Sequence, residues 1–451
     1  MFTLSCVRRL RTPSSRPAQP IARPGIALLA LAAIIALPAA GYAQPTLSLA
    51  DAQRIAVERS RQLAAQDASI AASREMAAAA GQLPDPVLRL GIDNLPVDTS
   101  DRFSLTRDFM TMRRIGVMQE FTRSDKRRLR SARFERETER AVAEKSVAVA
   151  ALQKDTALAW LDRHYLERMR AVVGANADES KLEIEAAEGA YRAGRGSQAD
   201  IYTARASRVA LDDRLSDLDR RIRNARTQLK RWVGDAGDVE LAGEPAYKTV
   251  RLDGHMLDQE IERHPEIALL ARNVAIAETE TELARANKQA DWSVELAYQE
   301  RGSAFSNMIS VGVSIPLQWD QKNRQDRELA AKLALTERAR AQQEDTLRAH
   351  IAEIRAMLNE WENGHERIAR FERELVPLAR DRTAAALAAY RGGKSDLNAV
   401  LAARRNEIEV RTQTLQLEMD TARLWAQLNF LAPDNGHATS SNAGATAKEA
   451  K

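Results

Sequence analysis

The chain carries one structural plan twice, at a spacing of about 200 residues. The segment Tyr191–Arg195 (YRAGR) returns 199 residues later as Tyr390–Lys394 (YRGGK). In the same way, Arg114–Val117 (RIGV) is matched by Ser310–Val313 (SVGV). A repeat of this length predicts that the two halves fold into similar units. The first repeat covers residues 44–232, a linker covers 233–251, and the second repeat covers 252–431.

Each repeat contains a very long helical stretch and a shorter helix that returns along it. Residues 125–191 contain no proline and residues 322–390 contain only Pro377, and both stretches are rich in good helix formers. The returning helices, 197–232 and 395–431, carry apolar residues at the spacing of coiled coils. The helix at 395–431 carries two such apolar stripes, which predicts packing neighbours on both of its sides. These stripes are Leu401, Ile408, Leu415 and Ala422, and Val410, Leu417 and Leu424.

Four short segments between the helices alternate apolar and polar residues. They lie at about 86–93, 114–121, 293–299 and 308–317. Such alternation predicts strands with one apolar face. A transmembrane β-barrel wall and a soluble sheet with one buried face both fit the pattern. In the barrel interpretation, the clearest lipid-facing row is Ile309, Val311, Val313, Ile315 and Leu317.

Two tryptophans favour the barrel over the soluble sheet. Trp292 opens the third strand and Trp319 follows the fourth, so a hairpin places both indoles at one edge, as in a membrane-interface girdle. A buried structural role for either indole is the alternative. Four strands cannot close a membrane barrel, because the smallest barrels have about eight, and open edges leave backbone groups unsatisfied in lipid. The pattern therefore predicts that several chains share one barrel.

Composition narrows the class of protein. Charged residues make up 29% and aromatic residues 5%, and the mean hydropathy is −0.42, which excludes a polytopic helical membrane protein. Residues 1–43 have the basic start, short apolar run and small-residue end of a secretory signal peptide, with a retained anchor helix as the alternative. This leader holds five arginines, no acid and the only cysteine, Cys6. The remaining chain is close to neutral, and nucleic acid is not an expected partner.

Motifs of catalysis are absent from the sequence. There is no Walker A, GxGxxG or GxSxG motif, and the six histidines are scattered without a close-spaced metal pattern. We therefore predict no enzyme activity, no cofactor and no metal site. Met110 and Met112, between the first two strands, are weak exceptions, because thioether sulfur binds soft Cu(I) or Ag(I). Packing is the better explanation of these two methionines, because two thioethers make a poor metal site.

Turn residues separate each long helix from its returning helix. Gly194 and Gly393 suit the left-handed residue that ends a helix. Ser197 and Ser395 suit the N-cap of the helix that follows. If the helices run away from a membrane, these two turns form the far tips of the molecule.

Each tip also holds a carboxylate close to the start of the returning helix. Asp200 and Asp396 fall within the expected first turns, where a negative charge interacts favourably with the helix dipole. Three copies of either residue would make an acidic ring, which is a known basis of cation selectivity. Helix stabilisation alone and a selectivity or gating ring are both open interpretations.

Four segments, in this order, resemble the TolC-like outer-membrane factors of Gram-negative tripartite efflux and type I secretion systems. They are LSLADAQRIAVERSRQL (Leu47–Leu63), RRIGVMQEF (Arg113–Phe121), VGVSIPL (Val311–Leu317), and VPLA through AYRGGKSDLNAVLAARR (Val376–Arg405). The resemblance covers essentially the whole mature chain. It implies a mainly α fold with a small barrel contribution: a homotrimer whose twelve strands close one outer-membrane β-barrel, continued by a periplasmic helical tunnel. It also implies a passive exit duct that docks on a periplasmic adaptor and an inner-membrane pump.

The segments Gln82–Val97 and Asp108–Phe121 further resemble the branch that serves heavy-metal exporters of the resistance-nodulation-division type. This implies heavy-metal cations as substrates. Many family members are lipoproteins, but this chain has no cysteine at the expected mature N-terminus, so its attachment would depend on the barrel alone. Residues 432–451 are typical of a disordered tail.

With two tips in each chain, a trimer would present six similar elements to adaptor hairpins. The expected docking residues are Tyr191, Arg192, Gly194, Tyr390, Gly393 and Lys394. The alternative function is a periplasmic coiled-coil scaffold or adaptor without a membrane span. An adaptor should carry a β-rich lipoyl-like domain beside one helical hairpin, whereas this chain has two hairpins and strands only in alternating pairs.

Overall fold

The computed structural model describes residues 46–251, 261 and 264–434. The expected signal peptide and nearly all of the expected tail lie outside these residues. The elements in chain order are β1 (Thr46–Leu47), α1 (Leu49–Arg59), α2 (Arg61–Ala80), β2 (Val87–Asp93), β3 (Met112–Phe121), α3 (Ser124–Arg192), α4 (Gln198–Val233), η1 (Gly234–Asp238), β4 (Glu240–Leu241), α6 (Pro265–Ala286), β5 (Trp292–Glu300), β6 (Met308–Ser314), α7 (Gln325–Arg370), η2 (Phe371–Leu375), α8 (Val376–Arg391) and α9 (Leu397–Asn429).

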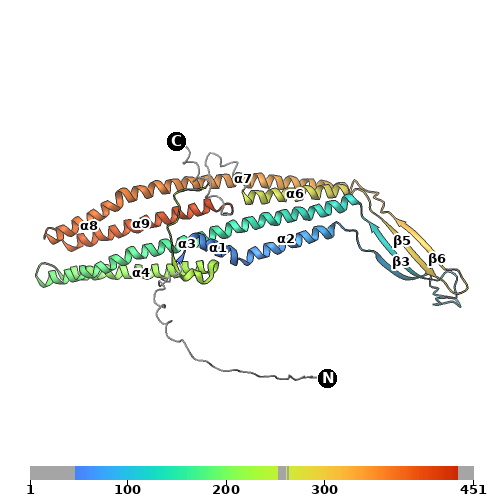
Figure 1. Ribbon diagram of the computed structural model, residues 1–451, viewed down its shortest axis with the longest axis horizontal. Coiled ribbons are helices and arrows are strands. Elements are labelled where there is room, and N and C mark those ends of the chain that lie inside the picture. The colour runs from blue at the N-terminus through green and yellow to red at the C-terminus, as the bar shows by residue number, and fades with distance from the viewer. Residues whose placement is uncertain (1–45, 252–260, 262–263, 435–451) are drawn as a thin grey trace, which may run out of the picture. The chain divides into compact units, whose positions relative to one another are not determined.

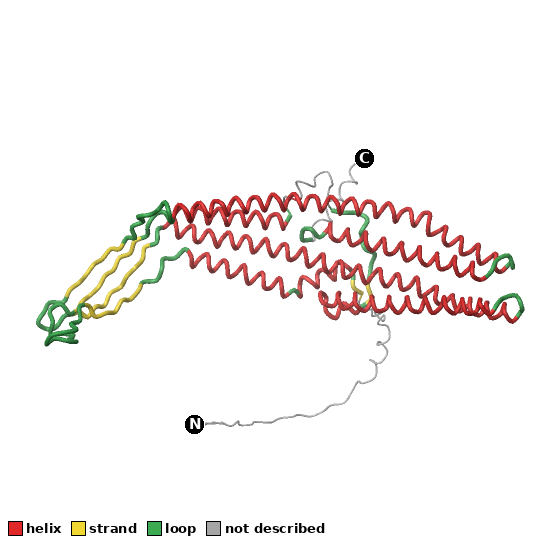
Figure 2. The backbone as a smooth tube through the Cα atoms, turned by 180° about the vertical axis from the view of Figure 1, so that it is seen from behind, coloured by secondary structure: helices red, strands yellow, loops and turns green. Residues whose placement is uncertain are grey.

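Long helices run beside one another, and one four-stranded sheet continues them (Figure 1). The prediction of a mainly α fold is confirmed. Helix α3 alone has 69 residues, which corresponds to about 100 Å at 1.5 Å per residue. The strands lie beyond the starts of α3 and α7, and the turns after α3 and α8 lie at the opposite ends of these helices (Figure 2). No helix within the described ranges has a stretch both long and apolar enough to cross a bilayer.

The main core forms where α1, α3, α4 and α9 pack together. Its largest buried side chains include Trp160, Tyr165, Leu229 and Met419. Helix α9 packs on α3 and also on α7 and α8, so the neighbours predicted on both of its sides are confirmed. Its first stripe is fully buried and its second stripe is half-buried.

The segment 239–251 crosses the helices, and three indole N–H groups hold it and its partner strand in place. Strand β4 in this segment pairs in parallel with β1. The three bonds run from Trp160 Nε1 to the carbonyl of Leu47 (3.0 Å), from Trp361 Nε1 to that of Tyr247 (3.1 Å), and from Trp425 Nε1 to that of Thr249 (2.9 Å). This crossing segment is therefore an ordered part of the core.

One long helix departs from its expected form. The sequence predicts a single helix over 322–390, but α7 ends at Arg370 and the π-helical turn η2 separates it from α8. The reason is Pro377, which has no N–H to donate and whose ring crowds the carbonyl of the preceding turn. A π-helical turn adjusts the hydrogen-bond pattern without ending the helix.

Candidate channel wall, tips and histidine cluster

The four strands form an antiparallel sheet in the order β2-β3-β5-β6, with a register that gathers apolar residues on one face. Leu90 lies across from Ile115, Ile115 across from Tyr298, and Tyr298 across from Ile309. Leu90 and Ile309 are 70% and 73% exposed. We call this surface the apolar sheet face, and it consists of Leu88, Leu90, Ile115, Val117, Leu296, Tyr298, Ile309, Val311 and Val313.

The opposite face of the sheet carries paired charges. Glu295 of β5 forms ion pairs with Arg114 on the neighbouring strand β3 and, at 3.3 Å, with Arg89 on β2, two strands away. Arg114 also lies 3.8 Å from Asp93. These four residues, which we call the charged sheet face, are balanced in charge. Because successive side chains of a strand point to opposite faces, the same strands separate an apolar surface from an ionic one.

The last strand is shorter than the sequence predicts. Strand β6 ends at Ser314, so Ile315 and Leu317 lie beyond it although both are exposed. Pro316 explains the early end, because proline cannot donate a hydrogen bond to the ladder. Of the row predicted to face lipid, only Ile309, Val311 and Val313 therefore lie within the strand.

Both predicted girdle tryptophans lie at the end of the sheet nearest the helices. Ser293 of β5 pairs with Ser314 of β6, which places the start of one strand beside the end of the other. Trp292 stacks on Phe121, with ring centroids 4.6 Å apart, and Trp319 is 87% exposed. Phe121 is not among the residues predicted for the girdle, although it ends the alternating 114–121 pattern.

The two turns at the far ends of the helices share one geometry. Gly194 and Gly393 have φ values of +64° and +70°, a conformation that penalises residues with a Cβ atom. The N–H groups of Arg195 and Lys394 donate back to carbonyls of the last helical turn, at 2.9 Å each. This is the Schellman arrangement that commonly ends a helix at glycine.

The helices that return from the turns begin with different caps. Ser197 and Asp200 form a capping box, in which each side chain accepts the other residue's backbone N–H. These bonds from the backbone and hydroxyl of Ser197 lower the pKa of Asp200. In the second turn, Asp396 and not Ser395 is the N-cap, and its Oδ1 accepts the Ala399 N–H at 2.9 Å. Asp396 therefore precedes α9, and the expectation that it lies inside the first turn is wrong.

Side chains behind the turns bring both tips of the chain together. Leu397, Val400 and Leu401 of α9 form one buried cluster with Ala187 of α3 and Ala204 of α4. Both turns lie at the same end in Figure 2. The predicted docking residues Tyr191, Arg192, Gly194, Gly393 and Lys394 are exposed there, and Tyr390 is half-buried against the cluster.

The two methionines proposed as weak metal ligands lie in different settings. Met112 is not in a loop as expected but begins β3, where it pairs with Asp93. Met110 stays in the preceding loop and is exposed. Packing in the sheet accounts for Met112.

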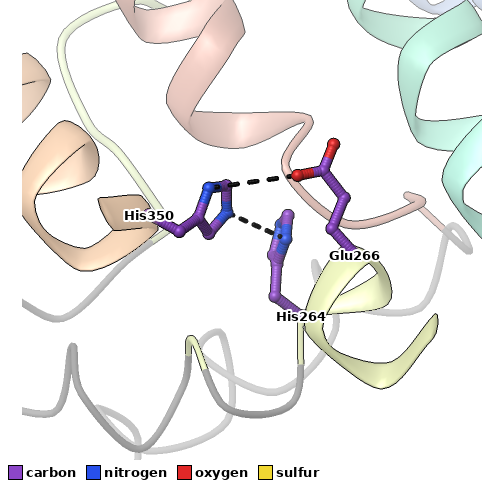
Figure 3. A group of neighbouring side chains, drawn as sticks. All are labelled: His264, Glu266 and His350. Carbon is purple, nitrogen blue, oxygen red and sulfur yellow. Dashed lines mark hydrogen bonds and ion pairs between the residues drawn. The ribbon is translucent and has the colours of Figure 1, made fainter. Parts of the chain in front are cut away.

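A different group of metal-binding side chains does come together, between α6 and α7 (Figure 3). His264 is the N-cap of α6, Glu266 lies in its first turn, and His350 projects from α7. His264 Nδ1 lies 3.2 Å from His350 Nε2, and His350 Nδ1 lies 3.9 Å from a Glu266 oxygen. The expectation of scattered histidines is wrong for this pair, because helix packing joins residues that lie 86 positions apart in sequence.

The environment of the cluster keeps His264 neutral. It is only 8% exposed, and this burial, followed by the facing His350, lowers its pKa to about 4. His350, Glu266 and Glu353 line the adjoining cleft of about 420 Å³.

Comparison with solved structures identifies the fold. No protein-family model and no curated protein matches the chain. Among solved structures, the outer-membrane channel OprN is 18% identical, with a TM-score of 0.71 over 86% of this chain and 90% of that one. The outer membrane protein VceC from Vibrio cholerae is 20% identical, with a TM-score of 0.70 over 85% and 95%. CusC, described through its folding and transmembrane channel formation, is 13% identical, with a TM-score of 0.74 over 87% and 93%.

The chain has an outer-membrane channel fold. These similarities cover most of both chains. The resemblance predicted from the sequence segments is thereby confirmed at the level of the fold. The structural neighbours are channel proteins, which agrees with the absence of catalytic motifs in the sequence.

Proposed function

We propose that the chain is the exit duct of a tripartite efflux system in the outer membrane of a Gram-negative bacterium, with a periplasmic extension. The apolar sheet face is the observation that carries this proposal. Its branched and aromatic residues are contiguous and exposed, and a soluble protein rarely leaves such a surface uncovered. Lipid would cover this face, while the charged sheet face would line a water-filled lumen.

The edges of the sheet supply the argument for three copies. Within the described part of the chain, β2 and β6 each pair with one strand only. An open edge in a bilayer is costly, because lipid offers its N–H and C=O groups no partner. Pairing β6 of one copy with β2 of the next would close the edges, and three copies would give a twelve-stranded barrel.

The sheet end and the tip end of the trimer would contact different partners. Trp292 and Trp319 would lie at the membrane interface, in contact with lipid. The six tips of a trimer would receive a periplasmic adaptor, and the inner-membrane pump would supply the energy for transport. Heavy-metal cations are the proposed substrates, on the resemblance of segments 82–97 and 108–121 to that branch of exporters.

The state of assembly tests the proposed function. We expect the purified protein in mild detergent to have the native mass of a trimer, and unheated samples to migrate differently from boiled ones on gels. Cell fractionation should place the protein in the outer membrane. A protein found only as a monomer in the soluble periplasmic fraction would contradict the duct and support the alternative of a periplasmic scaffold or adaptor.

Ion selectivity at the tips gives a second test. The substitution Asp396→Asn keeps an N-cap of nearly equal quality, so stability should change by less than about 0.5 kcal/mol. It removes three charges from the acidic ring proposed for the trimer. In planar bilayers, we expect the preference for cations to decrease and the block of the channel by multivalent cations to weaken. If both properties are unchanged in the variant, Asp396 serves only to start α9. The same substitution at Asp200 extends the test to the other set of tips.

A further inference from the structure

We propose that His264, His350 and Glu266 bind a divalent transition-metal ion of the zinc and copper(II) class. The site lies between α6 and α7, apart from the sheet and the tips. The proposal does not depend on conduction, because it concerns a structural ion bound to the chain itself. It goes beyond the duct by adding a bound ligand to the helical part of the protein.

The distances suit a single ion. His264 Nδ1 and His350 Nε2 are 3.2 Å apart, and two nitrogens bound to one tetrahedral ion at 2.0–2.1 Å are separated by about 3.3–3.4 Å. One atom from each of the three side chains falls within 4.8 Å of the others. Glu266 is 54% exposed, so its carboxylate is free to rotate toward the two nitrogens.

A second observation concerns the polar atoms of His264. The ring of His264 is more than nine-tenths buried, and its Nδ1 faces the Nε2 of His350 at 3.2 Å. In the empty site, the two facing nitrogens can satisfy each other only if one of them carries a proton. An ion bound between them would replace that proton and use both lone pairs. A buried histidine aimed at a second histidine is thus better explained by a ligand than by core packing.

The cleft beside the cluster favours a cation and gives it access. Its lining includes Glu266, Glu353 and Asp155, opposed by the single ammonium group of Lys154. Glu353 lies 4.0 Å from His350 Nδ1, where it could hold the proton of the coordinated ring, as carboxylates commonly do beside metal-bound histidines. Two imidazoles with a carboxylate suit zinc or copper(II), whereas an all-oxygen site would suit magnesium or calcium.

Metal binding is tested on the full chain, purified in detergent and stripped with a chelator. We expect one high-affinity Cu²⁺ per chain, with a paramagnetic resonance spectrum that shows two nitrogen ligands, and competition by Zn²⁺. His350→Gln should weaken Cu²⁺ binding more than about tenfold and remove one nitrogen from the spectrum. The matched control is His365→Gln in the same helix, because this histidine bonds the Tyr247 carbonyl outside the cleft, and it should bind Cu²⁺ like the parent.

A second variant covers the case in which His350→Gln does not fold. Glu266→Gln changes an exposed side chain, so the trimer should form normally while Cu²⁺ affinity falls at least tenfold. Affinity and spectrum equal to the parent in either folded variant would overturn the proposed site. Failure of the trimer or of conduction leaves this measurement intact, since binding is read from each chain directly.

Discussion

Replacing Val311 by arginine is expected to prevent the chain from assembling in the outer membrane. Val311 lies in the middle of β6, is 71% exposed, and is opposite Leu296 on the apolar sheet face. An arginine facing lipid near the midplane costs about 2–4 kcal/mol, and a trimer would carry this cost three times. The measurement is the amount of heat-modifiable trimer recovered from the outer-membrane fraction.

Ser310→Arg is the matched control for this substitution. Ser310 is the neighbouring residue and points to the charged sheet face, across from Ala297. An arginine there would extend into water, and most of the trimer should still form. Equal recovery of the Val311 and Ser310 variants would show that the two faces of the sheet are assigned wrongly.

Neutralising Glu295 is expected to shift the ion preference of the channel strongly toward anions. Among the residues that the structure describes, Glu295 is the only acid that pairs with both Arg89 and Arg114 on the charged sheet face, and its side chain is 18% exposed. The substitution Glu295→Gln would leave each chain with one uncompensated positive charge, and a trimer with three in one narrow ring. Reversal potentials in salt gradients across planar bilayers measure this change.

The same substitution should also weaken the sheet. Hydrogen bonds to charged groups contribute about 1.5–3 kcal/mol each, so the unheated trimer should dissociate at a lower temperature. Glu300→Gln is the control, because Glu300 belongs to the same strand but pairs with Arg113 at its outer end. A normal ion preference in the Glu295 variant would contradict a lumen bounded by the charged sheet face.

The alternation of single residues was sufficient to predict the faces of the sheet. With a period of two, Ile309 and Val311 must share a face, and a shift of the strand by one residue would place serine and glycine there instead. The long helices were predictable for a related reason, since stretches without proline and with coiled-coil spacing leave few other structures. These features depend on residues close together in sequence.

The parts that sequence did not predict depend on tertiary packing. Ser395 and Asp396 are both good N-caps, and the choice depends on where Leu397 becomes buried in the cluster behind the tips. The pairing of His264 with His350 depends on the way α7 packs on α6, which no spacing along the chain records. Pro316 signals the early end of β6 in the sequence, whereas the apolar alternation through Ile315 and Leu317 predicts a longer strand.

The crossing segment also determines the order in which the protein can fold. The indole bonds to this segment and to its partner strand β1 join positions separated by 113, 114 and 176 residues, whereas α3 and α4 are connected by a short turn and can pair as soon as both are synthesised. Loop closure over such distances carries an entropic cost before any contact repays it. Trp425 lies near the end of α9, so its bond to the Thr249 carbonyl can form only after almost the whole chain has been synthesised. A polypeptide truncated before Trp425 would contain helical hairpins but would lack the hydrogen bond that joins α9 to the crossing segment. We expect such a chain to be degraded by proteases more readily than the full chain.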